Sequence, residues 1–427
     1  MFRLCVGRKL KMALQALTGK PSEVGWRTPL VVVTCGCLIA LLSFGPRSSL
    51  GFFLTPLSNA NHWGRDVFAL ALAIQNLLWG IGQPFAGGVA DRFGPMRVLV
   101  AGALCYVAGL VIMAYATTPL VLNLSAGVLI GLGLSGCSFN LVLGAFGKLL
   151  PLEWRSLAFG AGTAAGSLGQ FLYSPAGVGM IDAFGWQNAL LAFAGITLLI
   201  LPLATALAAP RSTESVRATV TPPPQSFRQA LAEAFGHRSY VLLVLGFFTC
   251  GFQLAFVTVH LPSYLLDRGL SAEVGGWTLA TIGLFNIIGS LLAGYLGNRL
   301  PKRYILSFIY FVRAVSIVVF ITLTPSTAGT LIFGAVTGLL WLSTVPPTSS
   351  LVALMFGTRW LAMLFGFAFF SHQVGGFLGV WLGGVVFDAY GSYTPVWWLS
   401  VAFGVASAII NLPIVEQPVG EPAPAAA

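Results

Sequence analysis

Twelve apolar stretches run through this chain, and their length constrains its fold more than any other feature. Each is roughly 20 to 28 residues long, which lets a helix cross a hydrocarbon core about 30 Å thick. None shows the strict alternation of apolar and polar residues that is typical of strands in a membrane barrel. Only 8% of the residues are charged, compared with about a quarter in a soluble domain. The sequence therefore predicts an all-α integral membrane protein.

The predicted spans form two groups of six, which a polar segment separates. The first group covers residues 30–57, 67–94, 98–117, 119–149, 157–182 and 185–207, and the second covers 240–267, 273–300, 304–325, 329–356, 361–388 and 393–414. They define an N-terminal tail (1–29), a six-helix half (30–207), a linker (208–239), a second six-helix half (240–414) and a C-terminal tail (415–427). The linker carries three successive prolines at 222–224 and then an amphipathic helical pattern over 226–235.

The two halves repeat one pattern. Three pairs of equivalent features are separated by 206 or 207 residues: Pro56 and Pro262, Asp182 and Asp388, and the hexapeptides at 87–92 and 294–299. Because these pairs occur in the same order in both halves, they indicate two pseudo-symmetric units built on one six-helix plan.

The net charge of +10 reflects membrane topology rather than a nucleic-acid partner. Lys and Arg near the ends of membrane spans collect on the cytoplasmic side. Here they precede the first span and occupy every second loop, whereas only Arg65 and Arg268 lie in the opposite set of loops. We therefore expect a multi-pass protein of the plasma (inner) membrane, with the lipid bilayer around it and both termini in the cytoplasm.

The cysteines and the polar residues of the spans predict neither a disulfide nor a metal or cofactor site. Five of the six cysteines lie inside apolar spans, and Cys5 lies in the tail that we expect to be cytoplasmic, where thiols stay reduced. Cys35 and Cys37 face different directions on a helix, which favours small buried side chains over metal ligands. No nucleophile with a base and no phosphate-binding loop is recognisable in the sequence, so neither an enzyme nor an ATP-driven pump is expected.

The joint between the second and third spans has the most distinctive motif, Gly87-Gly-Val-Ala-Asp-Arg-Phe-Gly94-Pro-Met-Arg97. It resembles the loop between helices 2 and 3 of the major facilitator superfamily. Together with the duplicated halves, the resemblance implies a twelve-helix major facilitator fold, a monomer, alternating access and a substrate site near the bilayer midplane. It also implies a gating loop that holds one access state and comprises Gly87, Asp91, Arg92, Gly94 and Arg97. The alternative is that Asp91 and Arg92 only cap helices and follow the charge topology.

Three positions depart from the family pattern. Pro95 replaces a basic residue that is usual in the loop, and Asn298 stands in the second half where Asp91 stands in the first. Many proton-driven facilitators have an arginine in the fourth span, and this chain has about Gly127 at that place. This last departure weakens the interpretation of the chain as a drug exporter.

Two arginines lie inside the predicted spans, where a charge is costly and is therefore a functional candidate. Arg47 follows Pro46 in the first span and Arg313 lies in the ninth, whereas no acidic residue lies at comparable depth. A positive site without an internal counter-charge suits an anionic substrate. The alternatives are that Arg47 bonds to carbonyl groups freed by Pro46 and that Arg313 packs polar groups between helices.

A second resemblance narrows the substrate. The segment Phe44-Gly-Pro-Arg47-Ser-Ser-Leu-Gly-Phe-Phe-Leu-Thr-Pro56 resembles the monocarboxylate transporter family, in which a basic residue after a proline in helix 1 engages the substrate. The region from Gly133 to Trp186 is similar to the same family and to bacterial oxalate and formate carriers. Animal monocarboxylate carriers have an acid and an arginine four residues apart in helix 8, where this chain has Asn286 and Ser290, so their proton relay does not carry over.

Other polar or aromatic residues of the spans are candidates for substrate binding. Three of them recur every four residues on one face of the second span, and His372 can take up a proton near neutral pH. Hydrogen bonding between helices without ligand contact is the alternative for all of them. The candidates beside the two arginines are Gln75, Trp79, Gln83, Asn140, Gln170, Tyr173, Asn286, Ser290, His372 and Gln373.

These features together predict a secondary active transporter of small organic anions, with monocarboxylates and proton symport as the first expectation. Its partners would be the organic anion and either protons or a counter-anion. An exchanger of the oxalate and formate type is the alternative, because the spans lack an internal acid. A transporter-like membrane sensor is the other alternative.

Overall fold

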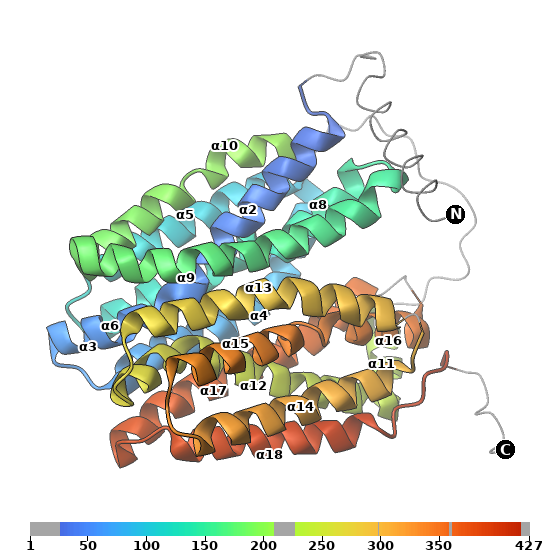
Figure 1. Cartoon of the computed structure of the whole chain (residues 1–427). Helices are drawn as coiled ribbons and strands as arrows, with labels where there is room; N and C mark the ends of the chain where they lie inside the picture. The colour runs from blue at the N-terminus through green and yellow to red at the C-terminus, as the bar shows by residue number, and fades with distance from the viewer. Residues whose placement is uncertain (1–25, 209–226, 298, 358–360, 420–427) are drawn as a thin grey trace, which may run out of the picture.

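The computed structural model describes residues 26–208, 227–297, 299–357 and 361–419, and every regular element in these ranges is a helix. Most of the predicted N-terminal tail, the prolines of the linker, Asn298 and the end of the C-terminal tail lie outside the described residues. Figure 1 shows the two halves side by side, the first in blue to green and the second in yellow-green to red.

The first half contains the elements from α2 to η3. Its helices are α2 (Pro29–Ser49), η1 (Leu50–Phe53), α3 (Leu54–Asn61), α4 (Arg65–Phe93), α5 (Pro95–Ala114), α6 (Pro119–Leu122), η2 (Asn123–Leu129), α7 (Ile130–Cys137), α8 (Phe139–Leu149), α9 (Leu152–Thr197), α10 (Ile200–Ala204) and η3 (Thr205–Leu207). The second half follows the linker helix α11 (Phe227–Gly236). Its helices are α12 (Arg238–Asp267), α13 (Ala272–Gly297), α14 (Lys302–Thr322), α15 (Thr327–Leu340), α16 (Val345–Phe356), α17 (Leu361–Tyr390) and α18 (Thr394–Asn411).

Within the described residues, 11 segments are long and apolar enough to cross a membrane. One of them, Gly160–Leu207, is a merged pair, because Gly185 interrupts it with a φ of 78° and a ψ of 159°. Glycine adopts this backbone conformation readily because it has no Cβ. The segment therefore supplies both the fifth and the sixth predicted spans, and the prediction of a twelve-span all-helical fold is confirmed.

The fourth and tenth spans are broken at equivalent depths. The fourth contains the π-helical segment η2 directly after α6, and extended backbone at Ser138 (φ −64°, ψ 156°) separates α7 from α8. The tenth is broken at residues 341–344, between α15 and α16. Irregular backbone at membrane depth persists only where protein or a cavity surrounds it. Both breaks therefore lie in the interior of the bundle, where a site between the halves is expected.

The halves pack together along two helix pairs, α4 with α17 and α9 with α13. We call the end of the bundle at which α2 begins the terminal end and the other the opposite end. On α4 and α17, there is no room for a side chain where Gly384 meets Ala69 or where Gly80 meets Gln373. One heptad farther toward the terminal end, a Cβ added at Gly87 or Gly366 would meet no atom of another helix within 4 Å.

The pair α9 and α13 is also tightly packed toward the opposite end and open toward the terminal end. Gly283 packs against the backbone of Phe171 and Ser167, whereas Gly160 and Gly294 nearer the terminal end have open space beside them. The halves are thus closed against each other at the opposite end and diverge toward the terminal end.

Candidate functional site

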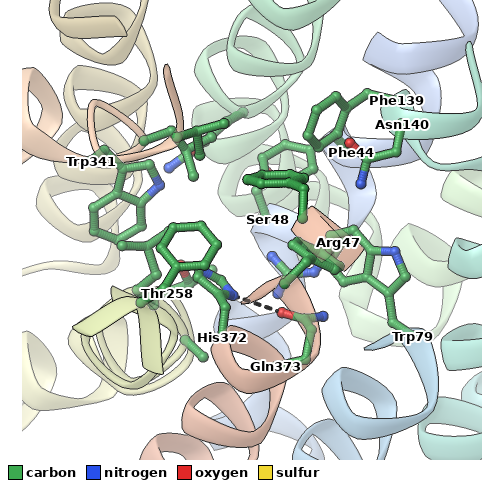
Figure 2. Close-up of a pocket in the computed structure, with 18 residues that line it drawn as sticks. Phe44, Arg47, Ser48, Trp79, Phe139, Asn140, Thr258, Trp341, His372 and Gln373 are labelled. Carbon is green, nitrogen blue, oxygen red and sulfur yellow. Dashed lines mark hydrogen bonds between the residues drawn. The ribbon is translucent and has the colours of Figure 1, made fainter. Parts of the chain in front are cut away.

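A cavity lies between the halves at the depth where α4 and α17 begin to diverge (Figure 2). The empty space within its bounds, including the solvent at its mouth, is about 710 Å³. Helices of both halves and the break in the tenth span line it. The lining residues are Phe44, Arg47, Ser48, Trp79, Phe139, Asn140, Gln170, Phe247, Leu254, Ala255, Thr258, Trp341, Leu342, Val345, Phe365, Phe369, His372 and Gln373.

Arg47 is the charged group of this cavity. Its Nη2 donates a hydrogen bond of 2.7 Å to the Oδ1 atom of Asn76 on α4, rather than to a carbonyl freed by Pro46. The guanidinium carbon lies 4.8 Å from the ring centre of Trp79 and 5.6 Å from that of Phe44. The Nε atom is buried and has no hydrogen-bond partner among the described residues. Arg47 is therefore held in place by neutral groups and keeps an unused donor.

A chain of hydrogen bonds connects Arg47 to the second half. The Nε2 atom of Gln373 donates to the backbone carbonyl of Asn76 at 3.2 Å. The Oε1 atom of Gln373 lies 3.0 Å from the Nδ1 atom of His372. Because this oxygen can only accept, Nδ1 of His372 carries the hydrogen, and Nε2 of a neutral ring carries a free electron pair. That Nε2 is buried and has no hydrogen-bond partner of good geometry in the described part of the chain, and the thiol of Cys250 is its electrostatic neighbour.

His372 lies among aromatic rings. It stacks on Phe369 with a centroid distance of 5.6 Å and an interplanar angle of 9°, and the centroid of Phe247 is 5.0 Å away. These rings fix the plane of the imidazole and limit its contact with water. Figure 2 shows His372 and Gln373 on one side of the cavity and Arg47 and Trp79 beside them.

The electrostatics of the cavity are one-sided. Neither an aspartate nor a glutamate occurs among its 18 lining residues. An arginine without a counter-charge in a poorly hydrated site is costly, and a bound anion supplies the missing charge. The arrangement is therefore suited to an anionic ligand, which would accept hydrogen bonds from Arg47.

Six of the predicted substrate-binding residues lie together in this lining: Arg47, Trp79, Asn140, Gln170, His372 and Gln373. Gln83 lies directly behind them, where its Oε1 accepts hydrogen bonds from Nε1 of Trp79 at 3.1 Å and from Oγ of Ser138 at 2.8 Å. Gln75 donates to the carbonyl of Ala126 at 2.8 Å and so connects α4 to η2.

The structure places the other four candidates away from the lining. Tyr173 packs over Gly45. Asn286 donates to Oγ of Ser167 at 3.0 Å, and Ser290 donates to the carbonyl of Asn286 at 2.8 Å.

Arg313 is the fourth of these candidates. It is buried behind the cavity wall and donates to the carbonyls of Leu340 and Trp341, where the tenth span breaks. Its Nη1 atom also lies 3.4 Å from Oε1 of Gln253. Its donors thus satisfy backbone groups that the broken helix leaves free.

The gating loop is partly described. Gly87 lies in α4, and Gly94 joins α4 to α5 with a φ of 89°, which favours glycine. Arg97 is exposed in the first turn of α5. The side chains of Asp91 and Arg92 lie outside the described residues.

The sequence interpretation missed most of the aromatic wall, the lining residues Ser48 and Thr258, and Asn76 behind the lining. Asn76 is next to the predicted Gln75 in the chain. A polar amide inside an apolar span is a recognisable feature of a sequence, and it would have been sufficient to identify Asn76. Aromatic residues give no such signal, because they look the same in a sequence whether they face a cavity or lipid. The missed aromatic residues are Phe44, Phe139, Phe247, Trp341, Phe365 and Phe369.

A second charged group closes the opposite end of the bundle. Arg65, at the start of α4, forms an ion pair with Asp267 at the end of α12, with nitrogen–oxygen distances of 2.7 and 2.8 Å. The Nη1 atom of Arg65 also donates to the hydroxyl of Tyr393 at 3.0 Å. Burial raises the pKa of Tyr393 to about 12, so the phenol stays neutral at physiological pH. This cluster joins the two halves on the side away from the terminal end.

Comparisons with known proteins agree with this architecture. The chain is 29% identical over 371 residues to an uncharacterized MFS-type transporter, YcxA of Bacillus subtilis (strain 168), covering 86% of this chain and 90% of that protein. It is 27% identical over 411 residues to monocarboxylate transporter 11 of Homo sapiens, covering 92% and 83% respectively.

A solved structure has the same fold. The bacterial homolog to the human lysosomal transporter Spinster, in an inward-facing and unoccupied conformation, superposes with a TM-score of 0.71 at 16% identity, covering 92% of this chain and 96% of that one. The sequence profile described as Major Facilitator Superfamily matches residues 36–380 and 267–427. The chain is therefore a transporter that belongs to the Major Facilitator Superfamily.

Proposed function

We propose that the protein carries small organic monoanions, in particular monocarboxylates, together with a proton. The observation that carries this proposal is Arg47, whose buried Nε lacks a described partner in a cavity lined by no acidic residue. A carboxylate at this position would accept charge-assisted hydrogen bonds from the guanidinium. The names of the relatives called monocarboxylate transporters support the same substrate class.

His372 is the proposed site for the proton. Its buried Nε2 lies in the same cavity as Arg47, and the hydrogen-bonded Asn76 and Gln373 lie between the two residues. A monoanion and a proton together add no net charge, so a pH gradient alone could drive their joint movement. Rocking of the two halves around the cavity would then expose it to each side in turn.

The predicted topology indicates to which side of the membrane the described conformation opens. The basic residues predict that the terminal end faces the cytoplasm of a plasma (inner) membrane protein. Because the halves diverge toward that end, the described state is proposed to be open to the cytoplasm. The cavity is lined by a single chain, so a monomer suffices for the proposal.

Anion exchange is the second candidate. It is favoured by the absence of aspartate and glutamate from the residues that line the cavity, since a carboxylate is a common proton carrier in transporters. In an exchanger, a second anion would replace the first on Arg47, and no proton would be needed.

Uptake into proteoliposomes tests both candidates. Labelled lactate, pyruvate, formate and oxalate would be supplied with and without an inward proton gradient. Accumulation driven by the gradient and lost in Arg47→Gln supports symport, whereas uptake that requires an internal anion supports exchange. Arg268→Gln is the matched control, because Arg268 is an exposed arginine at the opposite end. The lack of any carboxylate uptake by folded protein would exclude the proposed substrate class.

A further inference from the structure

The two halves contribute different chemistry to the cavity. The first half supplies its cation and several hydrogen-bonding groups, and the second supplies most of its apolar surface. The polar residues from the first half are Arg47, Ser48, Asn140 and Gln170. The apolar residues from the second half are Phe247, Leu254, Ala255, Trp341, Leu342, Val345, Phe365 and Phe369. The first half also contributes Phe44, Trp79 and Phe139, and the second half contributes Thr258, His372 and Gln373. A ligand that bridges the halves would meet the arginine on one side and a mostly apolar wall, half of it aromatic, on the other.

The side chains of this wall favour a ligand that carries an apolar group. Its aromatic residues present apolar surface to the cavity, and a two- or three-carbon carboxylate on Arg47 has no ring to pack against them. A ligand with an aryl group would bury that surface, and burial of apolar surface is favourable in proportion to its area. Aromatic rings also gain from edge and offset contacts with other aromatic rings. Phe247 and Phe369, which flank His372, and Trp341 are placed to make such contacts.

The charges of the lining restrict the ligand's other groups. Arg47 is its single arginine, and neither lysine nor an acidic residue occurs among the lining residues. A dicarboxylate would therefore bury a second charge without a permanently charged partner, and an amino acid would bury an ammonium group without a carboxylate. Both classes are disfavoured by the same cost of burying an unpaired charge.

We infer that the substrate is an aryl-substituted monocarboxylate without an amino group. Its carboxylate lies on Arg47 and its ring lies against Phe247, Trp341 and Phe369. This inference rests on the proposed function, because it assumes that Arg47 binds a carboxylate, and it goes further by specifying the remainder of the molecule.

Binding to the purified protein, measured by isothermal titration calorimetry, tests the inference. The ligands are acetate, phenylacetate, phenylalanine and terephthalate, which differ in the ring, the ammonium group and the second carboxylate. Burying a phenyl group predicts a phenylacetate affinity about 10- to 100-fold higher than that of acetate. Phenylalanine and terephthalate are each expected to bind at least about tenfold more weakly than phenylacetate.

Variants identify the groups responsible. Phe369→Leu keeps an apolar side chain without the ring, and it should lower the ratio of phenylacetate affinity to acetate affinity by about fivefold or more. Phe247→Leu should do the same. Phe308→Leu is the control, because Phe308 is an aromatic residue on the exposed surface of α14. Size-exclusion chromatography establishes that each variant is folded.

The outcomes separate this inference from the proposed function. Equal affinities for acetate and phenylacetate, both lost in Arg47→Gln, would overturn the inference and leave the proposed function intact. Binding of phenylalanine or terephthalate as tightly as phenylacetate would also overturn it. If folded protein binds none of the carboxylates, the inference and the proposed function both fail.

Discussion

The carboxylate of Asp388 accepts hydrogen bonds from the backbone N–H groups of Arg65 and Asp66, with nitrogen–oxygen distances of 3.2 and 2.7 Å. Asp388 lies near the end of α17 in the second half, and the two amides begin α4 in the first. The residue at the N-cap of α4 is Gly64, which has no side chain to cap the helix. Asp388 thus provides from the other half the cap that α4 lacks, and this contact exists only while the opposite end is closed.

Removing this cap should loosen the opposite end. A side-chain cap contributes about 0.5–2 kcal/mol, so Asp388→Ala should raise amide exchange in the first turn of α4 by about 2- to 30-fold. Hydrogen–deuterium exchange with mass spectrometry would measure it on peptides that cover residues 65–72. The control is Asp182→Ala, which removes the carboxylate at the equivalent place in the first half. Unchanged exchange in Asp388→Ala would show that the cap does not hold the two halves together.

The sequence was sufficient to predict the fold because the physical constraint is local. A span must be long and apolar to cross the bilayer, and the charges beside it follow the topology. Even the tight joint between the fifth and sixth spans is marked by Asp182-Ala-Phe-Gly185. Arg47 could be recognised in the same way, because a charged residue inside an apolar span is conspicuous.

The partners of these residues could not be predicted, because they depend on packing between distant segments. Arg65 and Asp388 are 323 residues apart in the chain. Arg313 looked like a substrate ligand, but its carbonyl partners become available only through the break after α15, which hydropathy does not reveal. Phe247 lines the cavity and Phe308 lies on the surface, although both are phenylalanines within apolar helices.

Asn76 should determine whether Arg47 is free to bind an anion. Asn76→Asp would place a carboxylate at the position of an oxygen now 2.7 Å from Nη2 of Arg47. This fixed counter-charge would compete with a ligand, so we expect carboxylate affinity to fall at least about tenfold. Titration calorimetry with the best-binding acid would measure the loss. Asn76→Ala removes the oxygen without adding charge and should cost less, and equal losses in the two variants would contradict a charge effect.

Arg313 and Arg47 should respond differently to substitution. Arg313→Leu leaves the buried carbonyls of Leu340 and Trp341 without their donors, which costs about 1–3 kcal/mol for each unpaired group. We expect a clearly lower melting temperature in detergent, with carboxylate affinity changed less than about twofold in the protein that remains folded. Arg47→Gln should show the reverse, a near-normal melting temperature and no carboxylate binding. A selective loss of binding in Arg313→Leu would instead make Arg313 part of the substrate site.

His372 should connect transport to pH. Protonation of Nε2 would add a positive charge beside the bound anion, so affinity for a carboxylate should rise as the pH falls. In His372→Gln this dependence should disappear, because an amide does not take up a proton, while binding at high pH changes little. Proteoliposome assays should then show anion exchange without accumulation driven by a proton gradient. His260→Gln is the matched control, since His260 is a buried histidine whose Nε2 already lies 2.7 Å from the carbonyl of Val380. Retained accumulation in His372→Gln would assign the proton to another group.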